Sequence, residues 1–98
     1  MIKVMLERRV KKGNFDKLME YLRDLRSAAL RQPGYVTGET LVKGTDPIDI
    51  LVISSWISEE HWAAWACAQP RIELDDMINR LLEDEPVCSI YKVPLEED

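Results

Sequence analysis

The chain has 98 residues, 46% hydrophobic and 32% charged, and a formal net charge of −5. We expect a single domain over residues 1–98, with its core in 2–93 and an acidic tail at 94–98. The acidic balance argues against nucleic acid as a partner, because phosphate binding needs clustered Lys and Arg. No apolar run approaches the roughly 20 residues that cross a bilayer, and the N-terminus lacks the regions of a signal peptide. The expected location is therefore the cytoplasm, away from membranes.

The two cysteines, Cys67 and Cys88, fit reduced thiols in that compartment. Their separation matches no zinc-binding spacing. The sequence also has no Gly-rich phosphate loop, no CxxC and no HExxH. We therefore expect neither a metal ion nor another cofactor.

The first half of the chain predicts three strands and one helix. Residues 2–10 alternate between apolar and polar side chains, which indicates a half-buried strand. Asn14 is a reasonable N-cap for the apolar stripe at helical spacing that runs from 15 to 30. The segment "QPGY" ends this helix, and "KGTDP" makes the turn between two further strands, at 35–43 and 48–57.

The second half predicts a divided helical region and a last strand. Ser58 is the expected cap of the next helix, and Pro70 interrupts that helix or starts a new one. Residues 87–93 form the last strand. The resulting β-α-β-β-α-β order is the ferredoxin-like arrangement of the α+β class, with a four-stranded antiparallel sheet and both helical segments on one face.

The third strand predicts that the sheet has a second apolar face. In "IDILVIS", Ile50 and Val52 lie on one side of the strand while Leu51 and Ile53 lie on the other. Helices cover only one face of such a sheet, so the other face needs a partner, and a second copy of the chain is the simplest one. The alternative is a central strand that tolerates a few exposed apolar groups.

The segment "SSWISEEHWAAW", residues 54–65, contains all three tryptophans and the only histidine of the chain. His61 and Trp65 lie one helical turn apart, Trp62 shares a face with Trp65, and Trp56 ends the preceding strand. Bulky indoles beside alanines can leave a hollow, as in a small-molecule site. The alternative is that the tryptophans are ordinary core and that His61 is an exposed residue of the first helical turn.

Arg8 lies on the same face of the first strand as Ile2, Val4 and Leu6. A buried charge is costly without a partner. Arg8 therefore either bends out from the strand end or points into a cavity, where it meets an anionic or carbonyl oxygen.

Two segments, "RQPGYVTGETL" and "DPIDILVISSWISEEHWAAW", together with the order of the elements, resemble the antibiotic biosynthesis monooxygenase (ABM) domain family. The resemblance covers roughly residues 2–93. It implies a dimeric α/β barrel, in which two sheets pack face to face in a homodimer.

The resemblance implies more than one function. One branch oxidises polycyclic phenols with molecular oxygen and without metal or flavin. Trp65 matches the helix Trp of that branch, and His61 stands where the branch has an Asn. A second branch degrades haem with a strand-one Asn and a haem-ligating His, and those two positions hold Arg8 and Asp75 here. A third group has no established chemistry.

The leading hypothesis is a cofactor-independent monooxygenase that oxidises a small aromatic phenol or quinol. His61 and Trp65 are the predicted catalytic residues, and Arg8, Trp56 and Trp62 the predicted substrate-binding residues. A non-catalytic dimeric module that binds a ligand or a partner is the alternative, and haem degradation ranks behind both.

Overall fold

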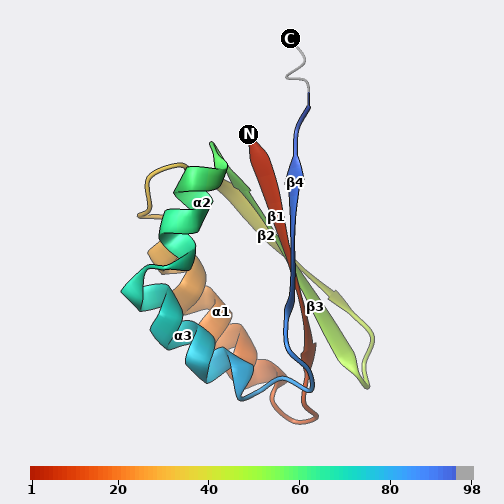
Figure 1. The fold of residues 1–98 in the computed structure, drawn as a ribbon. Helices are drawn as coiled ribbons and strands as arrows, with labels where there is room; N and C mark the ends of the chain where they lie inside the picture. The colour runs from red at the N-terminus through yellow and green to blue at the C-terminus, as the bar shows by residue number, and fades with distance from the viewer. Residues whose placement is uncertain (95–98) are drawn as a thin grey trace.

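The computed structural model describes residues 1–94, so residues 95–98 of the expected tail lie outside the described part. These described residues form three helices and four strands in the order β-α-β-β-α-α-β (Figure 1). The elements are β1 (Ile2–Val10), α1 (Phe15–Ala29), β2 (Tyr35–Lys43), β3 (Ile48–Trp56), α2 (Glu59–Ala66), α3 (Gln69–Asn79) and β4 (Val87–Lys92). Within residues 1–94, no helix combines the length and apolar character needed to span a membrane.

The four strands form one antiparallel sheet in the order β2-β3-β1-β4. All three helices lie on the same side of this sheet (Figure 1). The register places Ile2 opposite Trp56 and Leu6 opposite Val52, so these side chains share one face. The predicted ferredoxin-like α+β fold is confirmed.

The core lies between the helices and the sheet, and it has two parts. One cluster contains Trp56, Trp62, Trp65 and the first half of β1. The other contains Val10, Ile50 and buried residues of α1 and α3. Arg8 stands between Leu6 and Val10 on the helix-facing side of β1 and is only 3% exposed. A charged side chain therefore occupies a position that the strand pattern assigns to the core.

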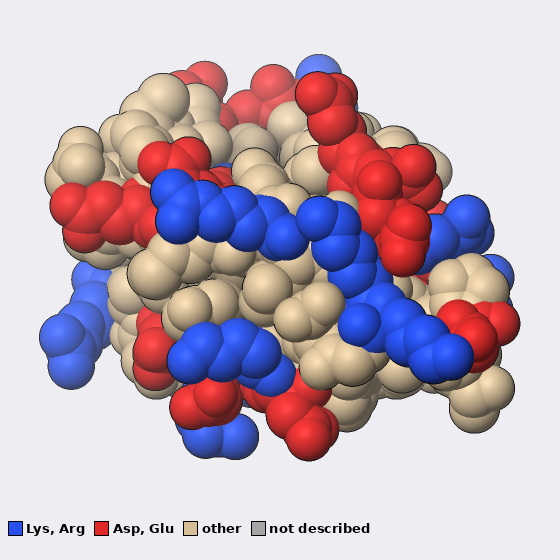
Figure 2. Space-filling view, turned by 90° about the horizontal axis from the view of Figure 1, so that it is seen from below, with Lys and Arg blue, Asp and Glu red and all other residues tan. Residues whose placement is uncertain are grey.

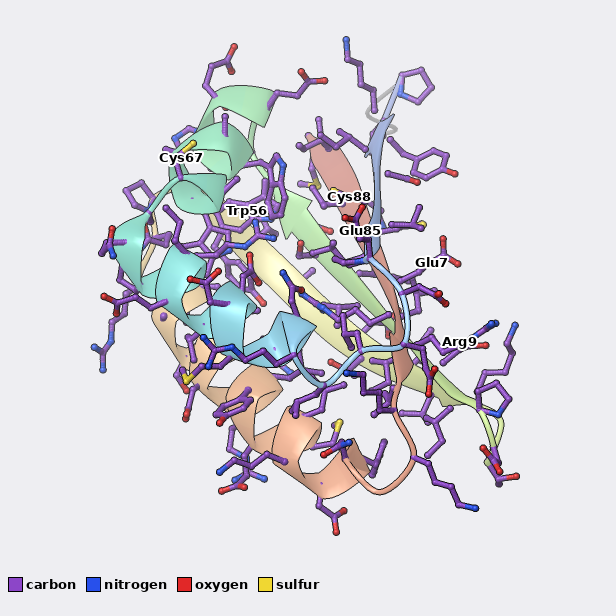
Figure 3. The ribbon with its side chains drawn as sticks, turned by 60° about the horizontal axis from the view of Figure 1, so that its bottom comes forward. Glu7, Arg9, Trp56, Cys67, Glu85 and Cys88 are labelled. Atoms are coloured by element: carbon purple, nitrogen blue, oxygen red, sulfur yellow. The ribbon has the colours of Figure 1, made fainter. Side chains whose placement is uncertain are left out.

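Within residues 1–94, no helix covers the opposite face of the sheet. Leu41, Val87 and Tyr91 are exposed there, and Leu51 and Ile53 are half-buried. Glu7 and Arg9 point away from the helices, whereas Trp56 lies between the helices and the sheet (Figure 3). The predicted second apolar face is thus present, mixed with charged groups.

Local sequence explains where the helices begin. The Ser58 hydroxyl accepts a hydrogen bond from the backbone N–H of His61 at 3.3 Å, as expected for an N-cap. Asn14 occupies the N-cap position of α1 but makes no side-chain capping bond there. Pro70 lies in the first turn of α3, where its missing N–H costs little, and it divides the second helical region as predicted.

Candidate functional site

A cavity opens between the helices and the sheet. Its walls come from the helix-facing sides of β1, β2 and β3 and from all three helices, and most of its lining is apolar. The cavity volume, counted as the space that the centre of a water molecule can reach, is about 60 Å³. One water needs roughly 10–15 Å³ on this measure, so the cavity holds about four to six waters, which together are close to the size of one aromatic ring.

All three tryptophans line this cavity, and each is less than a tenth exposed. Trp56 meets Tyr35 edge to face at 5.3 Å between ring centroids, and it meets Trp62 at 5.8 Å. The indole N–H of Trp56 donates a hydrogen bond of 3.0 Å to the Ser54 hydroxyl. The tryptophans therefore belong both to the core and to the wall of the cavity, the two alternatives that the sequence left open.

Two buried arginines contribute positive charge to the cavity, whose lining also includes the exposed Arg26 and Glu39. Arg8 of β1 is 3% exposed and Arg71 of α3 is 7% exposed, and both line the cavity. The Arg71 guanidinium lies 4.6 Å from the centroid of the Trp62 ring, a cation–π distance. Of the two outcomes expected for Arg8, the structure shows the one in which its side chain faces a cavity.

Asp75 of α3 pairs with both arginines. The Arg71 Nε donates a hydrogen bond of 3.0 Å to the Asp75 Oδ2, and the Arg8 Nη2 lies 3.8 Å from the Asp75 Oδ1. Burial lowers the pKa of the Arg8 guanidinium; the Asp75 charge opposes this effect, and the Arg71 charge adds to it. Arginine nevertheless stays protonated at neutral pH. Two positive charges therefore face one carboxylate.

His61 is not among the residues that line the cavity over the described chain. Its Nδ1 and the Ser58 hydroxyl oxygen are joined by a hydrogen bond of 2.7 Å. Its ring lies so close to Gly34 that a Cβ on that glycine would overlap it. The structure thus brings together Arg8 and the three tryptophans and places His61 at the junction between β2 and α2.

The sequence interpretation missed Arg71 and Asp75 as site residues. A signal for Arg71 was present, because it precedes the buried Ile78 by seven residues and therefore shares its helix face. Asp75 lies one turn after Arg71, the spacing of a helical ion pair.

The residues present do not fit a haem site of the kind that the resemblance raised. Asp75 stands at the position of the haem ligand, and two guanidinium groups already hold its carboxylate. Elsewhere within residues 1–94, no group of three or more His, Cys, Asp or Glu side chains could hold a metal ion. Cys67 and Cys88 are free and exposed.

A ferredoxin-like α+β domain with an aromatic, cation-containing cavity under its helices is the class that fold and site define. The family model described as "Antibiotic biosynthesis monooxygenase" matches residues 1–69, and the chain belongs to this family. The match includes Arg8 and the three tryptophans and ends before Arg71.

Solved structures agree on the fold. A conserved protein from Methanosarcina mazei Go1 is 18% identical with a TM-score of 0.86, covering 93% of this chain and 90% of that chain. An antibiotic biosynthesis monooxygenase is 17% identical with a TM-score of 0.86, covering 95% of this chain and 98% of that chain. SnoaB, a cofactor-independent oxygenase from Streptomyces nogalater, is 12% identical with a TM-score of 0.82, covering 97% of this chain and 95% of that chain. A comparison with curated proteins gave no match.

Proposed function

We propose that this protein is a cofactor-independent monooxygenase that oxidises a small aromatic phenol or quinol with molecular oxygen. The observation that carries the proposal is the ring-sized aromatic cavity with two buried guanidinium groups in its wall. The family match and the fold shared with SnoaB support the reaction class. We further propose that it acts as a homodimer in the cytoplasm, a reducing compartment that suits its two free cysteines.

The reaction balances without another electron donor. A phenol and one O₂ give a para-quinone and one water: one oxygen atom enters the ring, the other leaves as water, and the substrate supplies all the electrons. The phenol reacts as its anion, and a nearby positive charge in a desolvated site lowers the pKa of the phenol. In this proposal Arg8 and Arg71 stabilise the phenolate, and Trp56, Trp62 and Trp65 hold the ring away from water.

The catalytic role of His61 stays a prediction. Its hydrogen bond to Ser58 and its contact with Gly34 favour a positioning role, in which His61 fixes the start of the helix that carries Trp65. A direct proton transfer from substrate requires hydrogen-bond reach or one intervening water.

Oxygen uptake with single-ring phenols and hydroquinones tests this function. We expect the chelator-treated protein, without added flavin, to consume oxygen and form quinone, measured by an oxygen electrode and by quinone absorbance. Trp65→Phe and Arg8→Met should each lower kcat/KM at least about tenfold, since each removes an interaction with the reacting ring or its anion. Arg23→Met, an exposed position on α1 outside the cavity lining, is the matched control and should leave turnover unchanged. Oxygen uptake that does not depend on the protein, or that is equal in wild type and in a Trp65→Ala, His61→Ala double variant, rejects the proposal.

The alternative function is a non-catalytic module that binds a ligand in the same cavity. The position of His61 outside the cavity lining favours it, because the cavity then lacks the predicted proton acceptor. This alternative predicts that phenols raise the unfolding temperature without any oxygen consumption or product.

A further inference from the structure

Three nitrogen atoms of the buried arginines have no hydrogen-bond partner among residues 1–94. They are the Nε and Nη1 of Arg8 and the Nη1 of Arg71. Buried polar groups in native proteins are nearly always paired, so an unpaired group that lines a cavity indicates a missing acceptor. We infer that the cavity binds the carboxylate of a single-ring aromatic acid, with Arg8 and Arg71 as its anchors. This inference shares with the proposed function only the cavity as the ligand site, because it assigns the two guanidinium groups to a carboxylate in place of a phenolate.

The number of donors favours a carboxylate over a phenolate. The unpaired atoms carry five N–H bonds, one on Nε and two on each Nη1. A phenolate presents a single oxygen with three lone pairs. A carboxylate presents two oxygens with about four acceptor sites and accepts paired N–H bonds from a guanidinium.

The charges point to a monoanion. Arg8 and Arg71 carry two positive charges, and Asp75 neutralises one of them. Arg26 and Glu39, two exposed residues of the lining, carry opposite charges and add no net charge. Asp75 engages the Nη2 of Arg8 and the Nε of Arg71, and the three unpaired nitrogens described above form no hydrogen bond with it. One ligand carboxylate balances the remaining charge in a wall that is otherwise mostly apolar.

The walls and the volume define the rest of the ligand. The tryptophans and the aliphatic residues of α1 offer contacts to a planar apolar group, and the space suits about one ring. Arg71 and Asp75 lie beyond the residues that the family model matches. Of the two anchors, only Arg8 lies within the matched residues.

Benzoate and methyl benzoate test the inference directly. The two share a ring and nearly a shape, but only benzoate carries the negative charge. Calorimetric titration and thermal unfolding are carried out under nitrogen at pH 7.5, so that no oxidation contributes. We expect benzoate to bind and raise the unfolding temperature, and methyl benzoate to bind at least about tenfold more weakly, because charge-assisted hydrogen bonds are lost.

Variants assign the binding to the anchors. Arg8→Met and Arg71→Met should each weaken benzoate binding by about 10- to 100-fold while the chain stays folded, and Arg23→Met should bind as the wild type does. Equal affinity for benzoate and methyl benzoate, absence of benzoate binding, or full binding in both anchor variants overturns the inference. Charge-selective binding without oxygen uptake supports it and rejects the oxygenase. Turnover of neutral phenols without benzoate binding supports the oxygenase and overturns the carboxylate site.

Discussion

Arg8 occupies a core position on β1, and its burial has a cost that packing alone does not repay. Its Nη2 is 3.8 Å from Asp75, longer than a hydrogen bond, and two of its other nitrogens have no partner in the described part of the chain. Burial also lowers the pKa of this guanidinium, which means that the fold disfavours the protonated form. That cost is fully present at every pH below the lowered pKa, including neutral pH, and disappears only above it.

We therefore predict that Arg8→Met does not destabilise the fold. The free energy of unfolding should stay the same or rise by up to about 2 kcal/mol, because an apolar side chain of similar length replaces a poorly paired buried charge and Asp75 keeps Arg71 as its partner. Urea denaturation at pH 7 measures this free energy of unfolding. Arg9→Met, on the exposed side of the same strand, is the control and should change stability by less than about 0.5 kcal/mol. A loss of about 3 kcal/mol or more in Arg8→Met instead identifies Arg8 as a structural ion-pair partner.

At the scale of elements, the junction of β2 with α2 depends on Gly34. This residue has φ +83°, a left-handed conformation that side chains disfavour, and its missing Cβ leaves the space that the His61 ring occupies. The backbone N–H of Ile57 also donates to the carbonyl oxygen of Gly34 at 2.8 Å. Glycine here thus joins the turn before β2 to the segment that leads into α2.

Gly34→Ala should lower the free energy of unfolding by more than the backbone conformation alone explains. Gly13 supplies the matched control: its φ is +85°, and a Cβ there meets nothing within 4 Å. Gly13→Ala should cost about 1–2 kcal/mol from conformation only. Gly34→Ala should cost more, and in a His61→Ala background only part of this excess should disappear, because the imidazole ring is removed while the Cβ of residue 61 stays in close contact. Urea denaturation of the four variants gives the comparison, and equal costs for the two glycines in the wild-type background contradict it.

The sequence predicted the elements well because their signals are local. Period-two alternation in β1, the capping Ser58 and the break at Pro70 each act within a few residues. The apolar pattern of β3 also predicted that the sheet has two apolar faces.

The site was harder to predict because tertiary contacts create it. Arg8, Arg71 and Asp75 come from β1 and α3, and no sequence spacing brings them together. Helical spacing placed His61 near Trp65, but it carries no information on the space above Gly34, which received the His61 ring. Side-chain direction at an element junction depends on the neighbouring element, and a single sequence does not contain it.

For the whole molecule, the two faces of the sheet differ in what covers them. The helices bury one face, while the other exposes Leu41, Val87 and Tyr91 at 48%, 55% and 56%. A broader hollow of about 550 Å³ is lined in part by Leu41, Leu51 and Glu7. By contrast, Lys and Arg side chains lie among Asp and Glu side chains on the face seen in Figure 2. The helix-free face of the sheet is the surface that we propose for binding the second copy of the chain.

Ile53→Lys tests that surface. Ile53 lies in the central strand β3, opposite Met5 and Glu39, where facing sheets would bury it. A stable dimer buries about 800 Å² per partner, and an ammonium group in the middle of such an interface is costly to desolvate. Multi-angle light scattering should therefore give the wild type twice the 11.4 kDa of one chain and the variant a single chain. Ile57→Lys, at an exposed position one residue after the end of β3, should remain dimeric. Because the cavity lies on the helix side, monomeric Ile53→Lys should retain benzoate binding.

A wild-type protein of 11.4 kDa at about 50 μM, well above the dissociation constant of a stable dimer, rejects the proposed interface.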